Sequence, residues 1–509
     1  MVFRFFAAAK QIYSIVTVFR AAPVLFFTYS DGSNSPKRLK DLRPASALAA
    51  RQQHQEKFPP PDWFIALNPP FDIMPDAQLP ARPGNLTPEQ EAKLKELWIL
   101  VHKTFGVSPP PALLESSKLS VSTSIISTNG ISAPSEPAEE DGVDQKKKKR
   151  LGFLRKKEKK DDKEKSSTKS GSTIGIDDDD KYGQTKQFKT AISEMTPDEL
   201  RVAFWSMVKA DHPDGLLLRF LRARKWDVKK ALVMMISTMH WRLKEMNVES
   251  IVFKGEGAAI AEHDEGFMKQ IRLGKSYLHG TDISGRPICT VRARLHKQGD
   301  QSEDALNRYT IYVMETARMC LKDPVDTATV IFDLSDFSLA NMDYAPVKFM
   351  IKCFEAHYPE SLGICLVYKA PWIFQGIWNI IKGWLDPVVA SKIHFARSPD
   401  DLAKFLPKEK IWKELGGTND WEYKYIEPVA GEDDLLNDSE TREKLLEERE
   451  KIVREYEDAT WSWIFSTSSE FRNARNEIAK RLREDYVNID PYLRAKTVYD
   501  RVGYINLQK

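Results

Sequence analysis

Histidine and cysteine side chains supply many catalytic bases, nucleophiles and metal ligands, but their spacing in this sequence indicates none of these uses. The nine histidines are scattered, and the four cysteines (Cys289, Cys320, Cys353 and Cys365) form no C-x-x-C pair and show no zinc spacing. Because each cysteine stands among apolar residues, we expect reduced thiols in a core. The segment GEGAAI at Gly255 lacks the third glycine of a dinucleotide fingerprint, and neither a phosphate loop nor a nucleophile elbow occurs. We therefore expect a protein that is not an enzyme and needs no metal or cofactor.

The segment 371–385 is distinctive because apolar residues would surround nearly all of a helix formed by it. Its polar residues Gln375, Asn379 and Lys382 fall at i, i+4 and i+7 and form one narrow stripe. The apolar residues on the other faces include Trp372, Phe374, Ile377, Trp378, Ile381 and Trp384. Such a helix is either buried on nearly all sides or alternates between the protein and a membrane.

A third distinctive segment, KKKKRLGFLRKKEKK at Lys146–Lys160, is almost entirely basic around Leu151, Phe153 and Leu154. Three interpretations remain open for it: a solvated linker, a nuclear-import signal, or a tether to an anionic membrane surface. Each basic residue near an anionic leaflet contributes about 1 kcal/mol before the cost of ordering the chain. The tether is therefore energetically sufficient, although the pattern alone does not require it.

Composition limits the remaining possibilities. The chain has 509 residues, of which 42% are apolar, and 76 Lys and Arg against 73 Asp and Glu leave a net charge of only +3. This balance excludes a generally basic nucleic-acid binder, and we expect no nucleic-acid partner. In residues 1–30, Arg4, Lys10 and Arg20 interrupt the apolar runs well below the roughly 18 residues that a membrane span needs. These residues are either an organellar presequence or a disordered start, and we expect any membrane contact to be peripheral.

Changes of composition divide the chain into six parts. The capping box TPEQ at Thr87 opens an amphipathic helix, and a second box, TPDE at Thr196, opens another. The stretch between them is rich in Ser, Thr, Lys and Asp and lacks periodicity, which predicts disorder. We expect a disordered or presequence-like tail (1–57), a proline-rich arm with the first helix (58–115), a disordered charged insertion (116–187), further helices (188–250), an α/β domain (251–425) and a charged helical extension (426–509).

Within 251–425, short β-rich runs alternate with helical patterns. The runs are KSYLHG, RPICTVRA, TATVIFDL, GICLVYKA and SKIHFA. TATVIFDL and GICLVYKA are nearly continuous apolar runs with a helical pattern between them, as in parallel strands covered on both faces. The sequence therefore predicts the α/β class, with a mainly parallel sheet after a helical subdomain. The extension shows a charged helix from about Ser439 to Tyr456 and no clear apolar stripe.

Seven motifs, in their order along the chain, resemble the CRAL-TRIO lipid-transfer family, and its fungal secretory-pathway phosphatidylinositol-transfer proteins most of all. They are LLLRFLRARKWDVKKAL from Leu216, SGRPI from Ser284, VIFDLSDFS from Val330, YPESLG from Tyr358, KAPWIF from Lys369, LDPVVASKI from Leu385 and KELGG from Lys413. The match covers roughly residues 195–425. The resemblance implies a helical subdomain followed by a lipid-binding domain, with 371–385 as a mobile gate helix.

The resemblance also implies which residues bind the lipid headgroup. Phosphatidylinositol carries one phosphodiester anion and a ring of hydroxyls, so its site needs a fixed cation and hydrogen-bond acceptors. Arg224, Lys225, Glu360 and Lys392 stand at the family's inositol-phosphate positions. Val389 stands where the family places a threonine near the phosphate, which removes one hydrogen bond worth about 0.5–1.5 kcal/mol.

A second departure concerns the choline site of the family members that also carry phosphatidylcholine. That site has two tyrosines, a serine and a threonine, whereas this chain has Leu278, Cys289, Ala328 and Val330 at the matching positions. A zwitterionic headgroup would be buried there without partners, so we expect that phosphatidylcholine binding is lost. Either a second, less polar ligand binds, such as a sterol, a squalene-like hydrocarbon or another neutral lipid, or this face is only core.

The function that the resemblance implies is non-enzymatic binding of phosphatidylinositol and its exchange between membranes. The bound lipid then takes the place of a cofactor, and the partners are phospholipid and an anionic membrane surface. Two alternatives remain: a carrier of a neutral lipid or sterol, and a lipid-presenting scaffold that stimulates a phosphoinositide kinase. We expect a cytoplasmic monomer that visits membranes transiently, with organellar import through the N-terminus as the other possibility.

Overall fold

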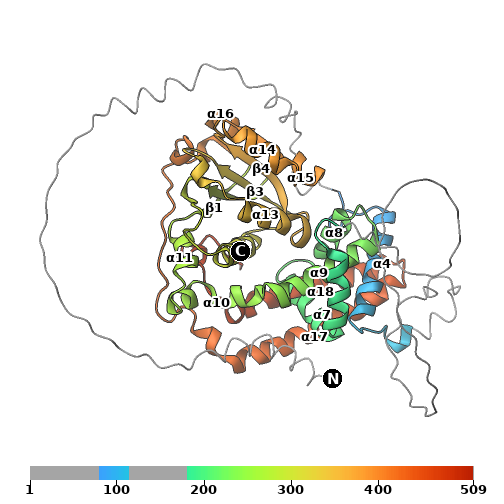
Figure 1. Ribbon diagram of the computed structural model, residues 1–509. Helices are drawn as coiled ribbons and strands as arrows, with labels where there is room; N and C mark the ends of the chain where they lie inside the picture. Colours follow the sequence, from blue (N-terminus) through green and yellow to red (C-terminus); the bar gives the residue numbers. More distant parts are fainter. Residues whose placement is uncertain (1–79, 114–179, 508–509) are drawn as a thin grey trace, which may run out of the picture.

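The computed structural model describes residues 80–113 and 180–507 (Figure 1). Within these ranges, no helix is long and apolar enough to cross a membrane, and no group of His, Cys, Asp and Glu side chains is arranged to hold a metal ion. The predicted tail 1–57, most of the proline-rich arm and of the charged insertion, and the basic run Lys146–Lys160 lie outside the described residues. What was expected of them stays a prediction.

The N-terminal helices form where their sequence signals predict them. They are α4 (Pro88–Thr104), α6 (Gln184–Glu194), α7 (Pro197–Val208), α8 (Pro213–Ala223) and α9 (Val228–His240). Both predicted capping boxes are present: the Thr87 and Thr196 hydroxyls each accept a backbone N–H in the first turn, and the side chains of Gln90 and Glu199 accept in return. The helix α6 begins at Gln184, inside the stretch that the sequence assigned to disorder up to residue 187.

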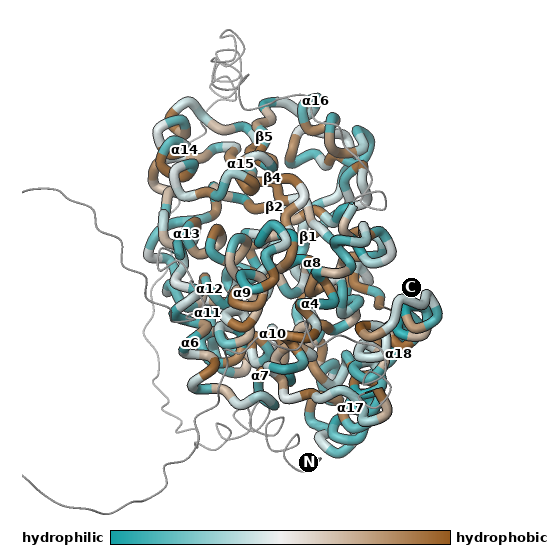
Figure 2. The backbone as a smooth tube through the Cα atoms, turned by 90° about the vertical axis from the view of Figure 1, so that its right-hand side faces the viewer, coloured by the Kyte–Doolittle hydropathy of each residue, from teal (hydrophilic) through white to brown (hydrophobic). Residues whose placement is uncertain are grey.

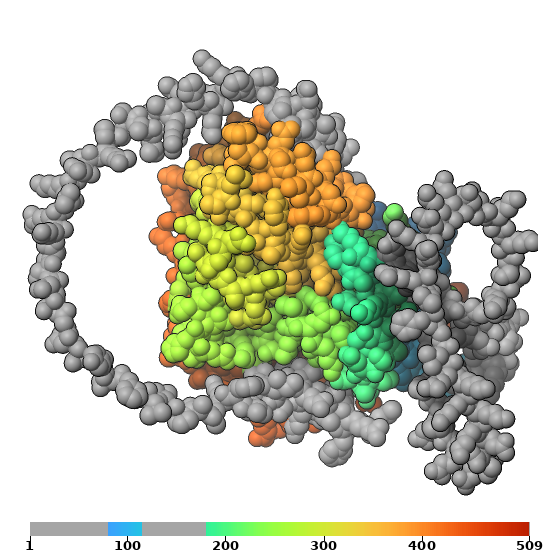
Figure 3. All heavy atoms as spheres, viewed as in Figure 1, coloured from blue at the N-terminus to red at the C-terminus, as the bar shows by residue number. Residues whose placement is uncertain are grey.

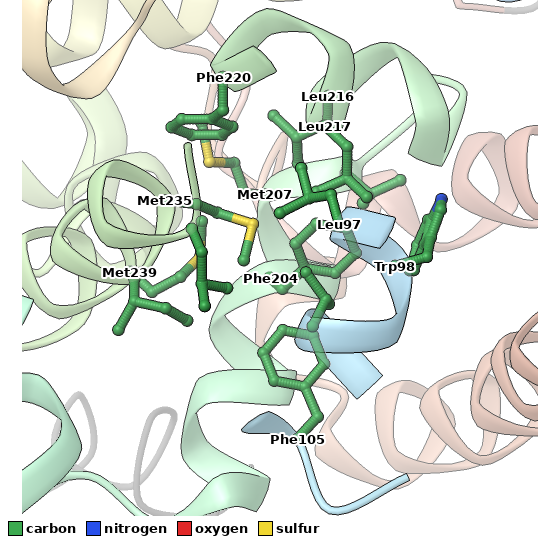
Figure 4. Packing of buried hydrophobic residues seen from close by; sticks show 14 of the residues in the cluster. Leu97, Trp98, Phe105, Phe204, Met207, Leu216, Leu217, Phe220, Met235 and Met239 are labelled. Atoms are coloured by element: carbon green, nitrogen blue, oxygen red, sulfur yellow. The ribbon is translucent and has the colours of Figure 1, made fainter. Parts of the chain in front are cut away.

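These helices share one hydrophobic core. In Figure 4 the side chains of Leu97, Phe204, Phe220 and Met235, from α4, α7, α8 and α9, point toward one another. Each of the four is completely buried. Since full burial of such a side chain contributes about 1.5–3 kcal/mol, this cluster is enough to hold the four helices together.

The chain then forms a five-stranded sheet with helices on its faces. The elements are a π-helical turn (Trp241–Glu245), α10 (Val248–Ala261), α11 (Glu265–Arg272), β1 (Ser276–Thr281), β2 (Pro287–Arg292), α12 (Glu303–Met319), β3 (Ala328–Asp333), α13 (Tyr344–Lys352), a second π-helical turn (Cys353–His357), β4 (Leu362–Tyr368), α14 (Phe374–Lys382), α15 (Pro387–Ser391), β5 (Ile393–Ala396) and α16 (Pro399–Leu402). All five predicted strands are present, in the order β1-β2-β3-β4-β5. Only β1 and β2 pair antiparallel, which confirms the mainly parallel sheet.

The two faces of the sheet have different coverings. One face packs against Leu402 and Trp412 in a closely packed core. The other face carries a row of one residue from each strand, in register across the sheet: Leu278, Cys289, Val330, Cys365 and Ile393. Figure 2 shows the hydrophobic character of β2 and β4 in the interior of this domain. All of the row's residues belong to one apolar cluster, which also contains residues of α14.

The C-terminal extension folds as a helical hairpin onto the N-terminal helices (Figure 1). It consists of α17 (Ser439–Ile464), α18 (Ser469–Leu493) and the short α19 (Val498–Arg501). The helix α17 continues past its expected end at Tyr456 and includes Trp461 and Trp463. Val453, Tyr456 and Trp463 are buried in the core that α4, α7, α8 and α9 share, so the hairpin is part of that core.

The last described residues cover the open edge of the sheet at β1. The Leu278 N–H donates to the Tyr499 hydroxyl over 3.0 Å, and the Tyr504 hydroxyl donates to the Gly280 carbonyl over 2.8 Å. The Tyr309 hydroxyl, from α12, bonds both the N–H and the carbonyl of Ser276. Three tyrosines therefore satisfy backbone groups that an edge strand would otherwise expose.

Candidate functional site

A cavity of about 250 Å³ lies between the apolar face of the sheet and the helices α12, α13 and α14. Four residues of the row across the sheet contribute to its wall: Cys289, Val330, Cys365 and Ile393. Phe332 and Val367, two residues further along β3 and β4, extend this wall. Because alternate residues of a strand point to the same face, these side chains form a continuous hydrocarbon surface. Such a surface suits an aliphatic ligand.

The helix α14 closes this cavity on one side. It is shorter than the expected 371–385, but its residues Phe374, Trp378 and Ile381 line the cavity, and Ile377 is buried beside them. On the opposite side, 87% of Trp372 and 46% of Ile380 are exposed. The polar stripe of Gln375, Asn379 and Lys382 also faces solvent, so the interpretation as a helix buried on nearly all sides is wrong. Figure 3 shows this segment, in orange, at the molecular surface beside the green N-terminal helices.

The carboxylate of Glu355 fixes the C-terminal end of the α14 segment. It accepts the Asp386 N–H over 2.7 Å and the Tyr182 hydroxyl over 2.6 Å. Lys181 joins Glu355 to the Trp384 carbonyl. Trp384 is half-buried and packs edge-on against Tyr344 at 5.4 Å between ring centroids. Sequence reasoning missed these contacts, because Lys181 and Tyr182 stand in the stretch that was expected to be disordered and carry no motif.

Two of the four predicted headgroup residues lie together. The Lys392 ammonium is 3.5 Å from the Glu360 carboxylate, and both side chains are about one-fifth exposed. Lys392 caps the C-terminus of α15 and stands between Val389 and Ile393, both of which line the cavity. The Glu360 carbonyl accepts a hydrogen bond from Arg219 over 2.7 Å, which holds its backbone in a left-handed conformation at φ 53°. This pair therefore lies near the cavity end where β4 and β5 begin, although the cavity wall itself is formed there by the neighbouring Leu362, Val389 and Ile393 and not by the pair.

The other two predicted headgroup residues stand apart from this pair. The Arg224 guanidinium donates to the amide oxygen of Gln184. Burial lowers the pKa of Arg224, an effect that the nearby carboxylates of Asp180, Asp386 and Glu355 oppose. Lys225 is exposed and has a left-handed backbone at φ 49°. Among the described residues, neither cation forms an ion pair with Glu360, so the four positions do not form one contact network.

The four residues at the matching choline positions are also divided. Cys289 and Val330 line the cavity, whereas Leu278 is only 2% exposed and packs beneath the C-terminal residues. Ala328 lies at the start of β3, opposite Leu362 of β4. None of these four side chains offers an oxygen or an aromatic face to a headgroup.

All four cysteines are free, as the sequence predicts for reduced core thiols. Burial raises the pKa of both Cys289 and Cys365 to about 12. A thiol with such a pKa carries almost no thiolate near neutral pH, so these residues serve the cavity as small apolar groups.

Comparison with known proteins agrees with this architecture. The chain matches the family model described as CRAL/TRIO domain over residues 271–417, and the model described as CRAL/TRIO, N-terminal domain over residues 184–237. It is 44% identical over 429 residues to a CRAL-TRIO domain-containing protein of Schizosaccharomyces pombe, a match that covers 83% of this chain and 92% of that protein. It is 41% identical over 450 residues to a protein of Eremothecium gossypii named phosphatidylinositol transfer protein, covering 85% of this chain and all of that protein.

A more distant relative is the Sec14 cytosolic factor of Schizosaccharomyces pombe. The two are 26% identical over 223 residues, which are 40% of this chain and 74% of that protein. The first two matches extend over most of both chains at high identity, and the family models cover the helices and the sheet that enclose the cavity. The chain therefore belongs to the CRAL-TRIO family, whose members are lipid-transfer proteins and not enzymes.

Proposed function

We propose that this protein binds phosphatidylinositol in the cavity beneath α14 and exchanges it between membranes. The observation that carries the proposal is the Lys392–Glu360 pair, whose chain neighbours Leu362, Val389 and Ile393 line one end of an apolar cavity. The Lys392 ammonium can hold the phosphodiester anion, and the Glu360 carboxylate can accept hydrogen bonds from inositol hydroxyls. The relative named phosphatidylinositol transfer protein supports the same ligand.

The cavity wall supports a ligand with acyl chains. Each buried CH₂ group contributes about 0.8 kcal/mol, so a carrier must offer apolar contacts comparable with those of a bilayer. Cys289, Val330 and Phe332 of the sheet, with Trp378 and Ile381 of α14, provide such contacts. Because Trp372, just before α14, is exposed, an outward movement of this helix would open the cavity against a membrane. A peripheral, cytoplasmic protein with membrane visits is part of the same proposal.

In this proposal, Arg224 contributes less to headgroup binding than Lys392 does. Its guanidinium already donates to Gln184, whose own amide group donates to the Ala356 carbonyl over 3.1 Å. Contact with a headgroup would require this guanidinium to share or leave the Gln184 oxygen. We therefore expect substitution of Arg224 to weaken binding less than substitution of Lys392.

A transfer assay with labelled phosphatidylinositol between vesicles tests the proposal. Lys392→Ala should reduce transfer at least tenfold, because it removes the cation that compensates the buried phosphate. The matched control is Lys408→Ala, at an exposed lysine that pairs with Asp400. It should transfer lipid at the parental rate. Equal transfer by Lys392→Ala and the parent, with both proteins folded, would contradict the proposal.

Phosphatidylcholine is proposed not to be a ligand. Leu278, Cys289, Ala328 and Val330 offer its headgroup no partners, so labelled phosphatidylcholine should move no faster than in a protein-free control. The apolar row instead favours a less polar second ligand, such as a sterol, a squalene-like hydrocarbon or another neutral lipid. Transfer of phosphatidylcholine well above the control would show that the matching of these positions is wrong.

A further inference from the structure

The end of the cavity opposite to Lys392 is polar. Lys275, His296 and Asp343 all line the cavity there. Lys275 precedes β1, and its carbonyl accepts the N–H of Arg292, the last residue of β2. Lys392, in contrast, precedes β5, which runs parallel to β2 through the intervening strands. The two lysines therefore stand at opposite ends of the strands, separated by roughly 20 Å of apolar wall.

The polar end is a chain of three side chains. The Lys275 ammonium lies 3.3 Å from Nδ1 of His296 and 3.2 Å from the amide oxygen of Gln301. The other ring nitrogen of His296, Nε2, lies 3.2 Å from Asp343 Oδ2. A neutral His296 that donates from Nε2 to Asp343 presents its Nδ1 lone pair to Lys275. The imidazole thus separates the cation from the carboxylate.

Lys275 is buried without an anionic partner. Its exposed fraction is 6%, and among the described residues no carboxylate forms an ion pair with it. The two acceptors are neutral and occupy two of its three N–H groups. Burying a cation is costly unless an anion compensates it, and the effect is visible here because burial lowers the pKa of Lys275 to about 8.

A purely structural role accounts for only part of this arrangement. The bonds to His296 and Gln301 do fix the loop after β2 against the start of β1. A neutral glutamine or asparagine would do this without burying a charge, however, and would leave no donor at the cavity wall. An ammonium that faces an apolar ligand cavity is the arrangement expected where the ligand itself brings the negative charge.

We propose that Lys275 forms a second polar site, which binds the carboxylate of a long-chain fatty acid whose hydrocarbon chain lies along the apolar row of the sheet. Cys289 and Val330 then contact methylene groups, and the carboxylate takes the free N–H of Lys275. A fatty acid has the hydrocarbon chain that the apolar row favours and differs from a neutral lipid by one negative charge at its end. The carboxylate site lies at the other end of the cavity from Lys392 and does not rest on phosphatidylinositol binding, but the fatty-acid chain uses the wall that acyl chains of phosphatidylinositol would use, so the two ligands exclude each other.

Equilibrium binding of radiolabelled palmitate to the purified full chain tests the site. Lys275→Met keeps an unbranched side chain of similar length and removes the charge, and it should weaken palmitate binding at least tenfold. The matched control Lys269→Met changes a nearby lysine that is 48% exposed and pairs with Asp300, and it should bind palmitate as the parent does. Equal palmitate affinity of Lys275→Met and the parent would overturn the proposal.

A comparison of ligands keeps the proposal falsifiable if Lys275→Met does not fold. The parent should bind palmitate at least tenfold more tightly than hexadecanol, which has the same chain length and no charge. Equal affinities for the two ligands would show that the carboxylate adds nothing to binding, and would overturn the proposed site at Lys275. A loss of palmitate binding in Lys392→Ala instead of Lys275→Met would place the carboxylate at the headgroup end, which also overturns it.

Discussion

At the scale of single residues, charged side chains of this protein differ in function according to burial and partner. Asp214 and Arg475 are both buried in the core between the N-terminal helices and α18, where the guanidinium bonds both carboxylate oxygens. Although burial alone would raise the pKa of Asp214, Arg475 holds it below its usual range. The Lys392–Glu360 pair, in contrast, is about one-fifth exposed, with the charges 3.5 Å apart.

This contrast predicts a large cost for breaking the buried pair. Arg475→Met should lower the free energy of unfolding by about 3–5 kcal/mol, because it leaves the Asp214 carboxylate buried and unpaired. The control on the same helix is Arg481→Met, which breaks an exposed pair with Glu455 and should cost less than about 1 kcal/mol. Urea unfolding followed by tryptophan fluorescence measures both. A cost for Arg475→Met no larger than for Arg481→Met would contradict this assignment.

At the scale of elements, α14 turns an apolar face to the cavity and its polar residues Gln375, Asn379 and Lys382 to solvent, where Ile380 and the preceding Trp372 are exposed as well. Trp372 and Ile380 are exposed without a partner surface in the described chain, which predicts that they contact membrane lipid. Trp372→Ala should reduce the fraction of protein that floats with phospholipid vesicles by several-fold, because it removes the largest exposed apolar side chain of the segment. Its thermal stability should stay near that of the parent.

The matched control for this prediction is Phe471→Ala, in α18. Phe471 is 40% exposed and lies in the first turn of α18, a helix that Figure 1 shows apart from α14. It should leave flotation unchanged if exposure on α14, and not apolar exposure in general, governs membrane contact. Equal flotation of the parent and Trp372→Ala would contradict a membrane-facing α14.

The elements also show which parts of the structure the sequence could predict. The strands and the capped helices α4 and α7 follow from local signals, such as the Thr87 and Thr196 boxes, and they form as expected. The hairpin of α17 and α18 was not recognised as core, because its buried face includes Arg449, Glu457 and Arg475. These charges interrupt the apolar stripe in the sequence. Their partners are distant in the chain: Glu457, for example, pairs with Arg201 over 2.8 Å.

The sequence likewise indicates one part of the candidate site, the residues Glu360 and Lys392, and not the other, the polar end at Lys275. The motifs around Glu360 and Lys392 identify a pair that lies together at the cavity, although its role in binding remains a prediction. The polar end at Lys275 has no motif, since His296 and Asp343 are distant from Lys275 in the chain and meet it only in the folded structure. From the sequence alone, a lysine just before a strand is expected to be exposed to solvent. The burial of Lys275 is visible only in the folded structure, where 6% of this residue is exposed.

At the scale of the whole molecule, the C-terminal residues pack into two cores, that of the N-terminal helices and that on the apolar face of the sheet. Tyr456 and Trp463 pack among the N-terminal helices, and Tyr499 and Ile505 pack under the sheet beside Leu278. A chain that ends at Asp438 should therefore unfold at a temperature at least 10 °C lower or fail to fold, since each lost aromatic contact removes about 1.5–3 kcal/mol. Differential scanning fluorimetry of both chains measures this effect. An unchanged melting temperature would show that the hairpin is a separate appendage.

The central claim is that this molecule carries phosphatidylinositol in its cavity. Mass spectrometry of the lipid that is extracted from the full chain, after purification from eukaryotic cells without detergent, tests it most directly. We predict phosphatidylinositol at close to one molecule per protein, and a loss of most of it from Lys392→Ala but not from Lys408→Ala. Protein that carries phosphatidylcholine in place of phosphatidylinositol, or equal phosphatidylinositol in Lys392→Ala and the parent, would contradict the account.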